Sequence, residues 1–73
     1  MRLPSYKPKE LLRIFKQLGF TVDHQTGSHI VLRHPEGKRA VIPMHGRELK
    51  RGTLLGIIKQ AGFTVEDFLN QSK

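Results

Sequence analysis

Residues 29–43, HIVLRHPEGKRAVIP, decide the fold of this chain. The two flanks of this stretch, residues 29–34 and 39–43, are short, rich in β-branched residues and bounded by turn formers, which is typical of strands. Between them, Pro35 suits the second position of a type I turn, and Gly37 suits a position that requires positive φ. The stretch therefore predicts an antiparallel hairpin.

A weaker strand and a helix precede this hairpin. Residues 20–24 have a strand-like pattern, so three strands are expected to follow one another in an antiparallel meander. Upstream, apolar residues recur at helical spacing, with Pro8 in the first turn and Gly19 just beyond the end, which predicts a helix over residues 8–18. These apolar positions are Leu11, Ile14, Phe15 and Leu18.

Two more helical patterns follow the hairpin. Residues 52–61 carry their apolar side chains on one helical face. Thr64 with Asp67 three residues later resembles a helix cap, and the short helix that it opens carries Phe68 and Leu69 inward. The predicted fold class is α+β, in the order α-β-β-β-α-α, with a three-stranded antiparallel sheet, helices packed on one face and the other face open.

Composition limits the kind of protein that this chain can be. Its 73 residues leave room for one hydrophobic core, so residues 1–73 are expected to form a single domain. The chain has no cysteine, which excludes disulfides and thiolate metal sites. No apolar run has the length of a membrane span, and no signal-type apolar stretch follows the N-terminus, so a cytoplasmic location is expected.

The charge balance favours a polyanionic partner. Thirteen Lys and Arg residues against six Asp and Glu give a net charge of +7. Such an excess attracts polyanions and speeds their association, which favours nucleic acid ahead of an acidic protein or an anionic lipid. Six of these thirteen cations fall within nineteen residues: Arg33, Lys38, Arg39, Arg47, Lys50 and Arg51.

One histidine is expected on the open face of the sheet. Along strand 29–34, Ile30 and Leu32 are the better core residues, which leaves His29 and Arg33 on the other face. A histidine among cations suits phosphodiester chemistry, because the cations hold phosphates while the imidazole moves the proton of a ribose 2′-hydroxyl. The alternative is a solvated basic face on which the histidines are incidental.

A second histidine, His24, has a position that depends on the turn. A two-residue turn at Thr26 and Gly27 places His24 directly across from His29, whereas a three-residue turn shifts the register and separates them. Asp23, the neighbour of His24 in a regular strand, is expected on the opposite face. A metal site built on the two histidines is therefore not expected.

Residues 27–45, GSHIVLRHPEGKRAVIPMH, and residues 46–69, GRELKRGTLLGIIKQAGFTVEDFL, resemble the HicA family of mRNA interferase toxins. These are small prokaryotic proteins that are paired with HicB antitoxins. The resemblance rests on a combination: the Gly-Ser-His triplet, the His-Pro step after the strand, the Pro-x-His segment that ends at His45, and Gly-Thr-Leu with Gln-Ala-Gly in the second helix. It covers nearly the whole chain.

The resemblance implies a fold like the double-stranded-RNA-binding domain. It also implies cleavage of mRNA that depends on His29 without a metal or other cofactor, with Gly27 and Ser28 shaping the turn that presents this histidine. A HicB-like antitoxin is the implied protein partner, and no membrane is involved. The chain departs from the family pattern at His24 and at Leu55, where members often carry basic residues.

The sequence thus predicts a ribonuclease toxin whose catalytic residue is His29. One alternative is a non-catalytic RNA-binding module of the same fold. Another is an interaction domain whose positive face docks an acidic partner, which is compatible with an antitoxin that covers the same face. The residues expected to bind RNA are Gly27, Ser28, His24, Arg33, Lys38, Arg39, Lys50 and Arg51.

Overall fold

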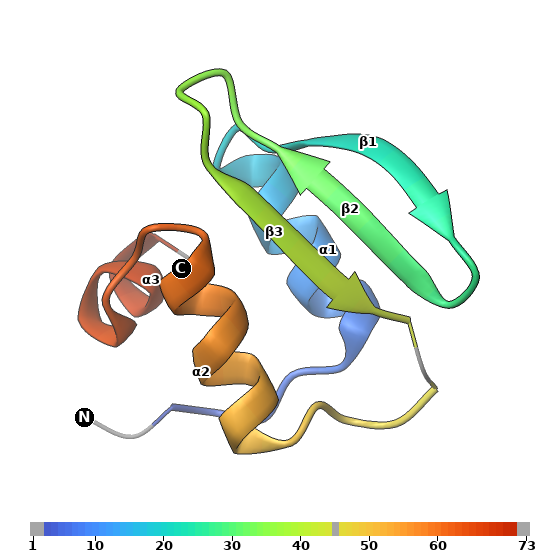
Figure 1. The fold of residues 1–73 in the computed structure, drawn as a ribbon. Coiled ribbons are helices and arrows are strands. Elements are labelled where there is room, and N and C mark those ends of the chain that lie inside the picture. The colour runs from blue at the N-terminus through green and yellow to red at the C-terminus, as the bar shows by residue number, and fades with distance from the viewer. Residues whose placement is uncertain (1–2, 45, 72–73) are drawn as a thin grey trace.

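The computed structural model describes residues 3–44 and 46–71, and Figure 1 shows how its elements are arranged. The α+β class and the predicted element order are confirmed. His45 of the Pro-x-His segment lies outside the described residues. None of the helices described is long and apolar enough to cross a membrane. The elements are α1 (Pro8–Gln17), β1 (Thr21–Thr26), β2 (His29–Arg33), β3 (Arg39–Pro43), α2 (Arg51–Gln60) and α3 (Val65–Gln71).

The β2–β3 hairpin forms as predicted. The two strands pair without irregularity, so that Ile30 lies opposite Ile42. In the connecting turn, the N–H of Gly37 donates to the carbonyl of His34 over 2.9 Å. This bond places Pro35 at the second position of the turn, and Gly37 takes a φ of +91°. The hairpin therefore rests on the turn chemistry that its sequence indicates.

The pairing of β1 with β2 differs from the prediction in two respects. Thr26 lies opposite His29, so the two-residue turn is made by Gly27 and Ser28 rather than by Thr26 and Gly27. Gly27 has a φ of +55°, and a positive φ at the first central position is the type II′ pattern, which favours glycine. The second difference is a β-bulge at Asp23, which lies between the Val22–Leu32 pair and the His24–Val31 pair.

The bulge changes the partner of His24. Val22 lies opposite Leu32, but His24 lies opposite Val31, so Asp23 is one extra residue in β1. Of the two alternatives that the sequence left open, the structure thus has the one in which His24 does not lie directly across from His29. Instead, His24 is offset from His29 by two residues along β2.

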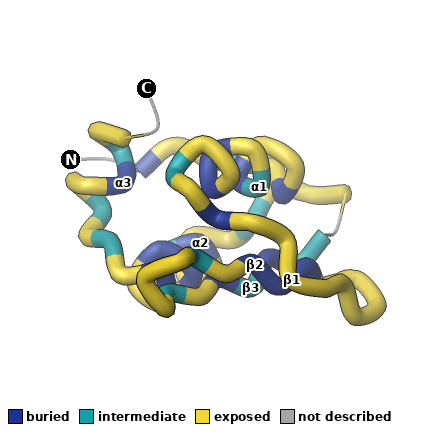
Figure 2. The backbone as a smooth tube through the Cα atoms, turned by 90° about the horizontal axis from the view of Figure 1, so that it is seen from above, coloured by how far each residue is buried: buried dark blue, intermediate teal, exposed yellow. Residues whose placement is uncertain are grey.

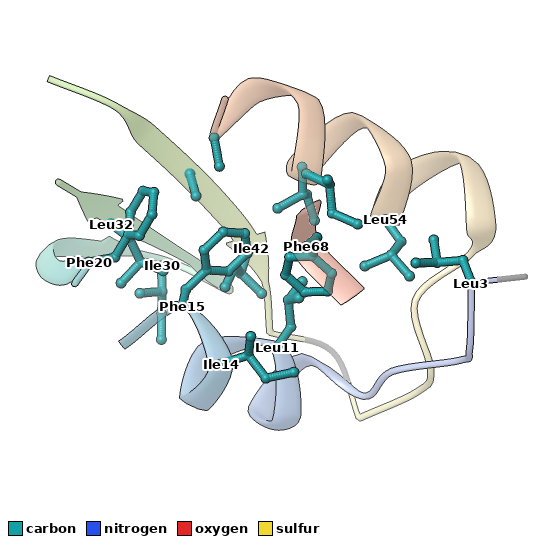
Figure 3. Close-up of a cluster of buried hydrophobic side chains, with 14 residues drawn as sticks. Leu3, Leu11, Ile14, Phe15, Phe20, Ile30, Leu32, Ile42, Leu54 and Phe68 are labelled. Atoms are coloured by element: carbon teal, nitrogen blue, oxygen red, sulfur yellow. The ribbon is translucent and has the colours of Figure 1, made fainter. Parts of the chain in front are cut away.

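The core occupies one side of the sheet. In Figure 1, α1 lies behind the strands and α2 lies beside β3, while no helix lies in front of the three strands. Figure 2, viewed from above, also places α1 on one side of the sheet. One cluster of buried apolar side chains joins β2 and β3 to all three helices (Figure 3). The face of the sheet away from α1, called the open face below, carries no helix among the described residues.

The two longer helices end in the same motif, which folds an aromatic residue back toward the core. The N–H of Phe20 donates to the carbonyl of Phe15 over 3.0 Å, and the N–H of Phe63 donates to that of Ile58 over 3.1 Å. This bond pattern is that of a Schellman C-cap. The rings of Phe15 and Phe20 meet edge to face, with centroids 5.0 Å apart.

Candidate nucleic-acid interface

His29 lies at the start of β2, directly after the tight turn, and is exposed. On one side it pairs with Thr26 of β1 and on the other with Pro43 of β3. The carbonyl of Ser28 accepts a hydrogen bond from the N–H of Met44, which ties the turn to the end of β3. The backbone around His29 is thus fixed by both neighbouring strands.

Three cross-strand pairs make up the β2–β3 part of the open face. Val31 is only 5% exposed, although no helix covers this face and it does not belong to the core cluster. Its cover therefore comes from side chains that share the open face. Along the strands, this face has a cationic end, an apolar middle and an imidazole end. The pairs are Arg33 with Arg39, Val31 with Val41 and His29 with Pro43.

Arg33 and Arg39 lie directly opposite each other on adjacent strands. Like charges in this position destabilise a sheet, so the pair needs an anion to offset its repulsion. Asp23 supplies part of this negative charge, because Oδ1 of Asp23 lies 3.4 Å from Nε of Arg33. The Arg33 side chain is still 59% exposed, which keeps it accessible to a phosphate. The cationic end of the open face is therefore suited to anion binding.

Asp23 and His24 point to the same face, and the expectation that they point apart is wrong. Nδ1 of His24 lies 2.7 Å from Oδ2 of Asp23. The bulge explains this, because two consecutive residues of β1 oppose one residue of β2 and strict alternation is interrupted. The hydrogen bond from His24 is the main cause that lowers the pKa of Asp23; partial desolvation opposes it, and the charge of Arg33 adds to the lowering.

The remaining histidine of the described strands and turns has a structural role. His34 is half-buried, and its ring centroid lies 5.1 Å from that of Phe20. Its Nδ1 accepts a hydrogen bond from the N–H of Glu36 over 3.1 Å, within the β2–β3 turn. Among the described residues, no three His, Asp or Glu side chains are grouped so that they could hold a metal ion. Within the part of the chain that the structure describes, the histidines of the open face are therefore His24 and His29.

Lys38 lies apart from the other residues that are predicted to bind RNA. It lies in the β2–β3 turn region, at the opposite end of β2 from His29. Its Nζ is 3.7 Å from Oε1 of Glu36 and 5.5 Å from the centroid of the Phe63 ring. The aliphatic part of the side chain passes close to Gly62. The structure thus packs Lys38 against the end of α2.

Lys50 and Arg51 stand at the start of α2 and belong to two different hollows. Lys50, with Arg47, lines a surface hollow that also includes Pro43, the cross-strand partner of His29. Arg51 lines another hollow, formed with the N-terminal segment. Of the two, Lys50 is therefore the cation that borders the His29 end of the sheet. Arg47 belongs to the basic cluster of the sequence but is not among the residues predicted to bind RNA, because only the fold brings it beside Pro43.

A comparison with known protein families identifies the family of this chain. The model of one family, the HicA toxin of bacterial toxin–antitoxin systems, matches residues 8–63, which include α1, the whole sheet and α2. The chain belongs to this HicA toxin family. No curated protein matches the chain.

Membership of the family has two direct consequences. HicA toxins are known as RNA-cleaving toxins, so RNA is the substrate class of the family. A toxin of a toxin–antitoxin pair also has an antitoxin as its partner. The positive charge of the chain and the open face are compatible with both kinds of partner.

Proposed function

We propose that this chain is a cytoplasmic mRNA interferase, an endoribonuclease in which His29 is the catalytic residue and no metal is required. Residues 1–73 act as a single toxin domain in this proposal. The observation that carries it is the position of His29: exposed, fixed by pairing on both sides, and on the same open face as Arg33 and Arg39. Family membership supports the substrate class.

The proposed reaction uses the ribose of the RNA itself. His29 accepts the proton of the 2′-hydroxyl, and the 2′ oxygen attacks the adjacent phosphorus. The bond from phosphorus to the 5′ oxygen then breaks, which leaves a 2′,3′-cyclic phosphate on one product and a 5′-hydroxyl on the other. A positioned imidazole contributes about 10²–10⁴-fold to such a step. This range predicts a slow enzyme, suited to regulation.

The surrounding residues bind and position the RNA in this proposal. Arg33 and Arg39 contact phosphates, because guanidinium groups match phosphate oxygens in geometry and charge. Lys50 contacts the strand at the other end of the face, beside the partner of His29. Gly27 and Ser28 act through the backbone, by fixing the turn from which His29 starts.

The nature of the products tests this function against a non-catalytic RNA-binding module. An end-labelled transcript is incubated with the protein in the presence of a chelator, and the new ends are identified by mass spectrometry. The expected products carry 2′,3′-cyclic phosphates, and a single 2′-deoxy substitution at the mapped bond blocks its cleavage. A transcript that is bound but stays intact supports the binding module. Cleavage that persists at the 2′-deoxy position contradicts the proposed chemistry.

We further propose that the antitoxin is HicB-like and covers the open face. Opposite charge speeds the association of such complexes, and the effect decreases with salt. The expected result is that an added HicB-like protein, encoded beside this chain, inhibits cleavage, and that Arg39→Glu slows its association. If the antitoxin inhibits cleavage but associates with the Arg39→Glu variant as fast as with wild type, it binds another surface and this proposal is wrong.

A further inference from the structure

We propose that His24, held by Asp23, is a second catalytic residue for RNA cleavage, which donates a proton to the leaving 5′ oxygen. This inference rests on the proposed function, in which His29 accepts the proton of the 2′-hydroxyl. An imidazole, unlike lysine or arginine, can exchange a proton near neutral pH.

The register places the two histidines on one face at a suitable offset. Thr26 lies opposite His29 and His24 lies opposite Val31, and residues that oppose each other in an antiparallel pair share a face. His24 and His29 are therefore diagonal neighbours across β1 and β2. Such neighbours are about 7–8 Å apart, within reach of aromatic side chains.

The chemistry of cleavage requires two proton-transfer sites that are separated. In an in-line displacement, the attacking and leaving oxygens lie on opposite sides of the phosphorus. Each must be within about 2.6–3.2 Å of the group that exchanges its proton. One imidazole does not meet both conditions at once. A diagonal pair of exposed histidines does, with the phosphate bound between them.

Asp23 fixes which nitrogen of His24 is available. An ionised carboxylate only accepts hydrogen bonds, so Nδ1 of His24 is the donor in the 2.7 Å contact with Oδ2. The lowered pKa of Asp23 keeps this carboxylate ionised at neutral pH. Proton exchange with the RNA is then left to Nε2. The His24 side chain is 52% exposed, which leaves room for a substrate.

Among residues 3–44 and 46–71, three charged or titratable side chains share the β1–β2 part of the open face with His24. On its own strand it contacts Asp23, and across β2 the groups on the same face are Arg33 and His29. Arg33 shares the carboxylate of Asp23, with Nε 3.4 Å from Oδ1. No described helix packs on this face. Asp23 therefore acts as a positioning residue that orients His24 between the phosphate-binding arginine and His29.

The proposed step balances in protons and electrons. The bond between phosphorus and the 5′ oxygen breaks, and its electron pair remains on that oxygen. The oxygen takes the Nε2 proton of His24, while the 2′-hydroxyl proton is on His29. His24 ends neutral and His29 ends charged, and exchange with water restores both. Arg33 and Arg39 offset the charge on the phosphate throughout.

A substrate with a 5′-bridging sulfur at the cleaved bond tests this role directly. A thiolate leaves without protonation, so the modified RNA does not need a general acid. We expect His24→Gln to slow cleavage of ordinary RNA by about 10²-fold or more, and to cleave the sulfur-containing RNA at close to the wild-type rate. Asp23→Asn should show a smaller loss that the same substrate rescues, because Asp23 acts through His24.

The outcomes separate this inference from the proposed function. His29→Gln should lose activity on both substrates, because the 2′-hydroxyl proton still has to be removed. If His24→Gln slows both substrates equally, His24 serves in binding or folding and the inference is wrong, while His29 keeps its role. If His29→Gln cleaves ordinary RNA at the wild-type rate, the proposed function itself is wrong.

The pH profile gives a second readout that a purely structural role would not change. A general acid must be protonated, so kcat/KM of the wild type should decline on the alkaline side, and His24→Gln should lose this decline with ordinary RNA. An unchanged alkaline limb in the variant contradicts the assignment. Circular dichroism of each variant confirms that the comparison is made between folded proteins.

Discussion

At the scale of single residues, the open face depends on a carboxylate that serves two partners. Asp23 receives the hydrogen bond of His24 on one oxygen and contacts Arg33 through the other. Both partners keep more than half of their side-chain surface exposed, so they are oriented without being covered. This arrangement fixes two functional groups while leaving them available to a substrate.

The Asp23 contacts predict a specific dependence of stability on pH. Since the pKa of Asp23 is lowered in the folded state, its contribution is fully present above the ordinary value of 3.8 and is lost as pH falls through the lowered pKa. Thermal unfolding should therefore show a stability difference between wild type and Asp23→Asn at pH 6 that narrows toward pH 3. The difference will be small, because exposed ion pairs are weak. A difference that widens on acidification contradicts this prediction.

The paired arginines predict a trade-off between binding and stability. Replacing Arg39 with glutamine removes one phosphate contact, so RNA affinity should fall and the slope of log K against log salt should decrease by about 0.7 for single-stranded RNA. The same change relieves the repulsion with Arg33 and should raise thermal stability slightly.

A matched control for this variant lies on α1. Arg13 is exposed on the helix that covers the opposite face of the sheet, so Arg13→Gln removes the same charge at a different place. It should change RNA affinity and salt slope much less than Arg39→Gln. Equal effects of the two variants would indicate that net charge, rather than the open face, determines binding.

At the scale of the elements, the turn before β2 determines where His29 stands. Gly27 has a φ of +55°, and a Cβ at this position would meet nothing within 4 Å. Gly27→Ala should therefore destabilise the protein by backbone strain alone, by about 1–2 kcal/mol, and not by crowding. Denaturant unfolding measures the loss, which should be accompanied by reduced RNA cleavage. Unchanged stability would mean that the turn adopts another conformation.

The sequence was sufficient to predict which face of β2 and β3 is buried, but not to predict the register of β1. In β2 and β3, alternate residues such as Leu32 and Ile42 belong to the core cluster, so the hydrophobic pattern specifies which face turns inward. All six residues of β1 are exposed, as Figure 2 shows for this edge strand. A strand without a buried face has no such pattern to fix its register, and an inserted residue leaves no trace in it. The bulge at Asp23 was therefore not predictable from periodicity.

The same limit applies to the candidate site. The positions of His29 and Arg33 on the open face follow from the buried neighbours Ile30 and Leu32, and sequence reasoning placed them correctly. The contact between Asp23 and His24 depends on the bulge and was missed. The packing of Lys38 depends on the end of α2, which is distant in sequence, so charge clustering alone assigned it to the RNA surface.

At the scale of the whole molecule, the last helix completes the core. The family match ends at residue 63, before α3 begins. Yet Phe68 of α3 is fully buried. Its ring packs edge to face on that of Tyr6, with the centroids 5.9 Å apart, and its centroid lies 5.7 Å from that of the Phe15 ring. The C-terminal helix thus joins the N-terminal segment to α1 in one hydrophobic cluster.

This packing predicts that Phe68 is essential for stability. Phe68→Ala should reduce the free energy of unfolding by about 3–5 kcal/mol, a large share of the total for a domain of this size. Chemical denaturation or a thermal melt gives the value. A loss below about 1 kcal/mol would show that α3 contributes little to the fold.

The most direct test of the account compares wild type with His29→Gln under single-turnover conditions, with chelator present and RNA binding measured on the same samples. The account predicts that the variant binds RNA within a few-fold of wild type, keeps its fold, and loses cleavage by at least about 10²-fold. Wild-type cleavage by a folded His29→Gln protein would contradict the central claim that this imidazole carries out the reaction.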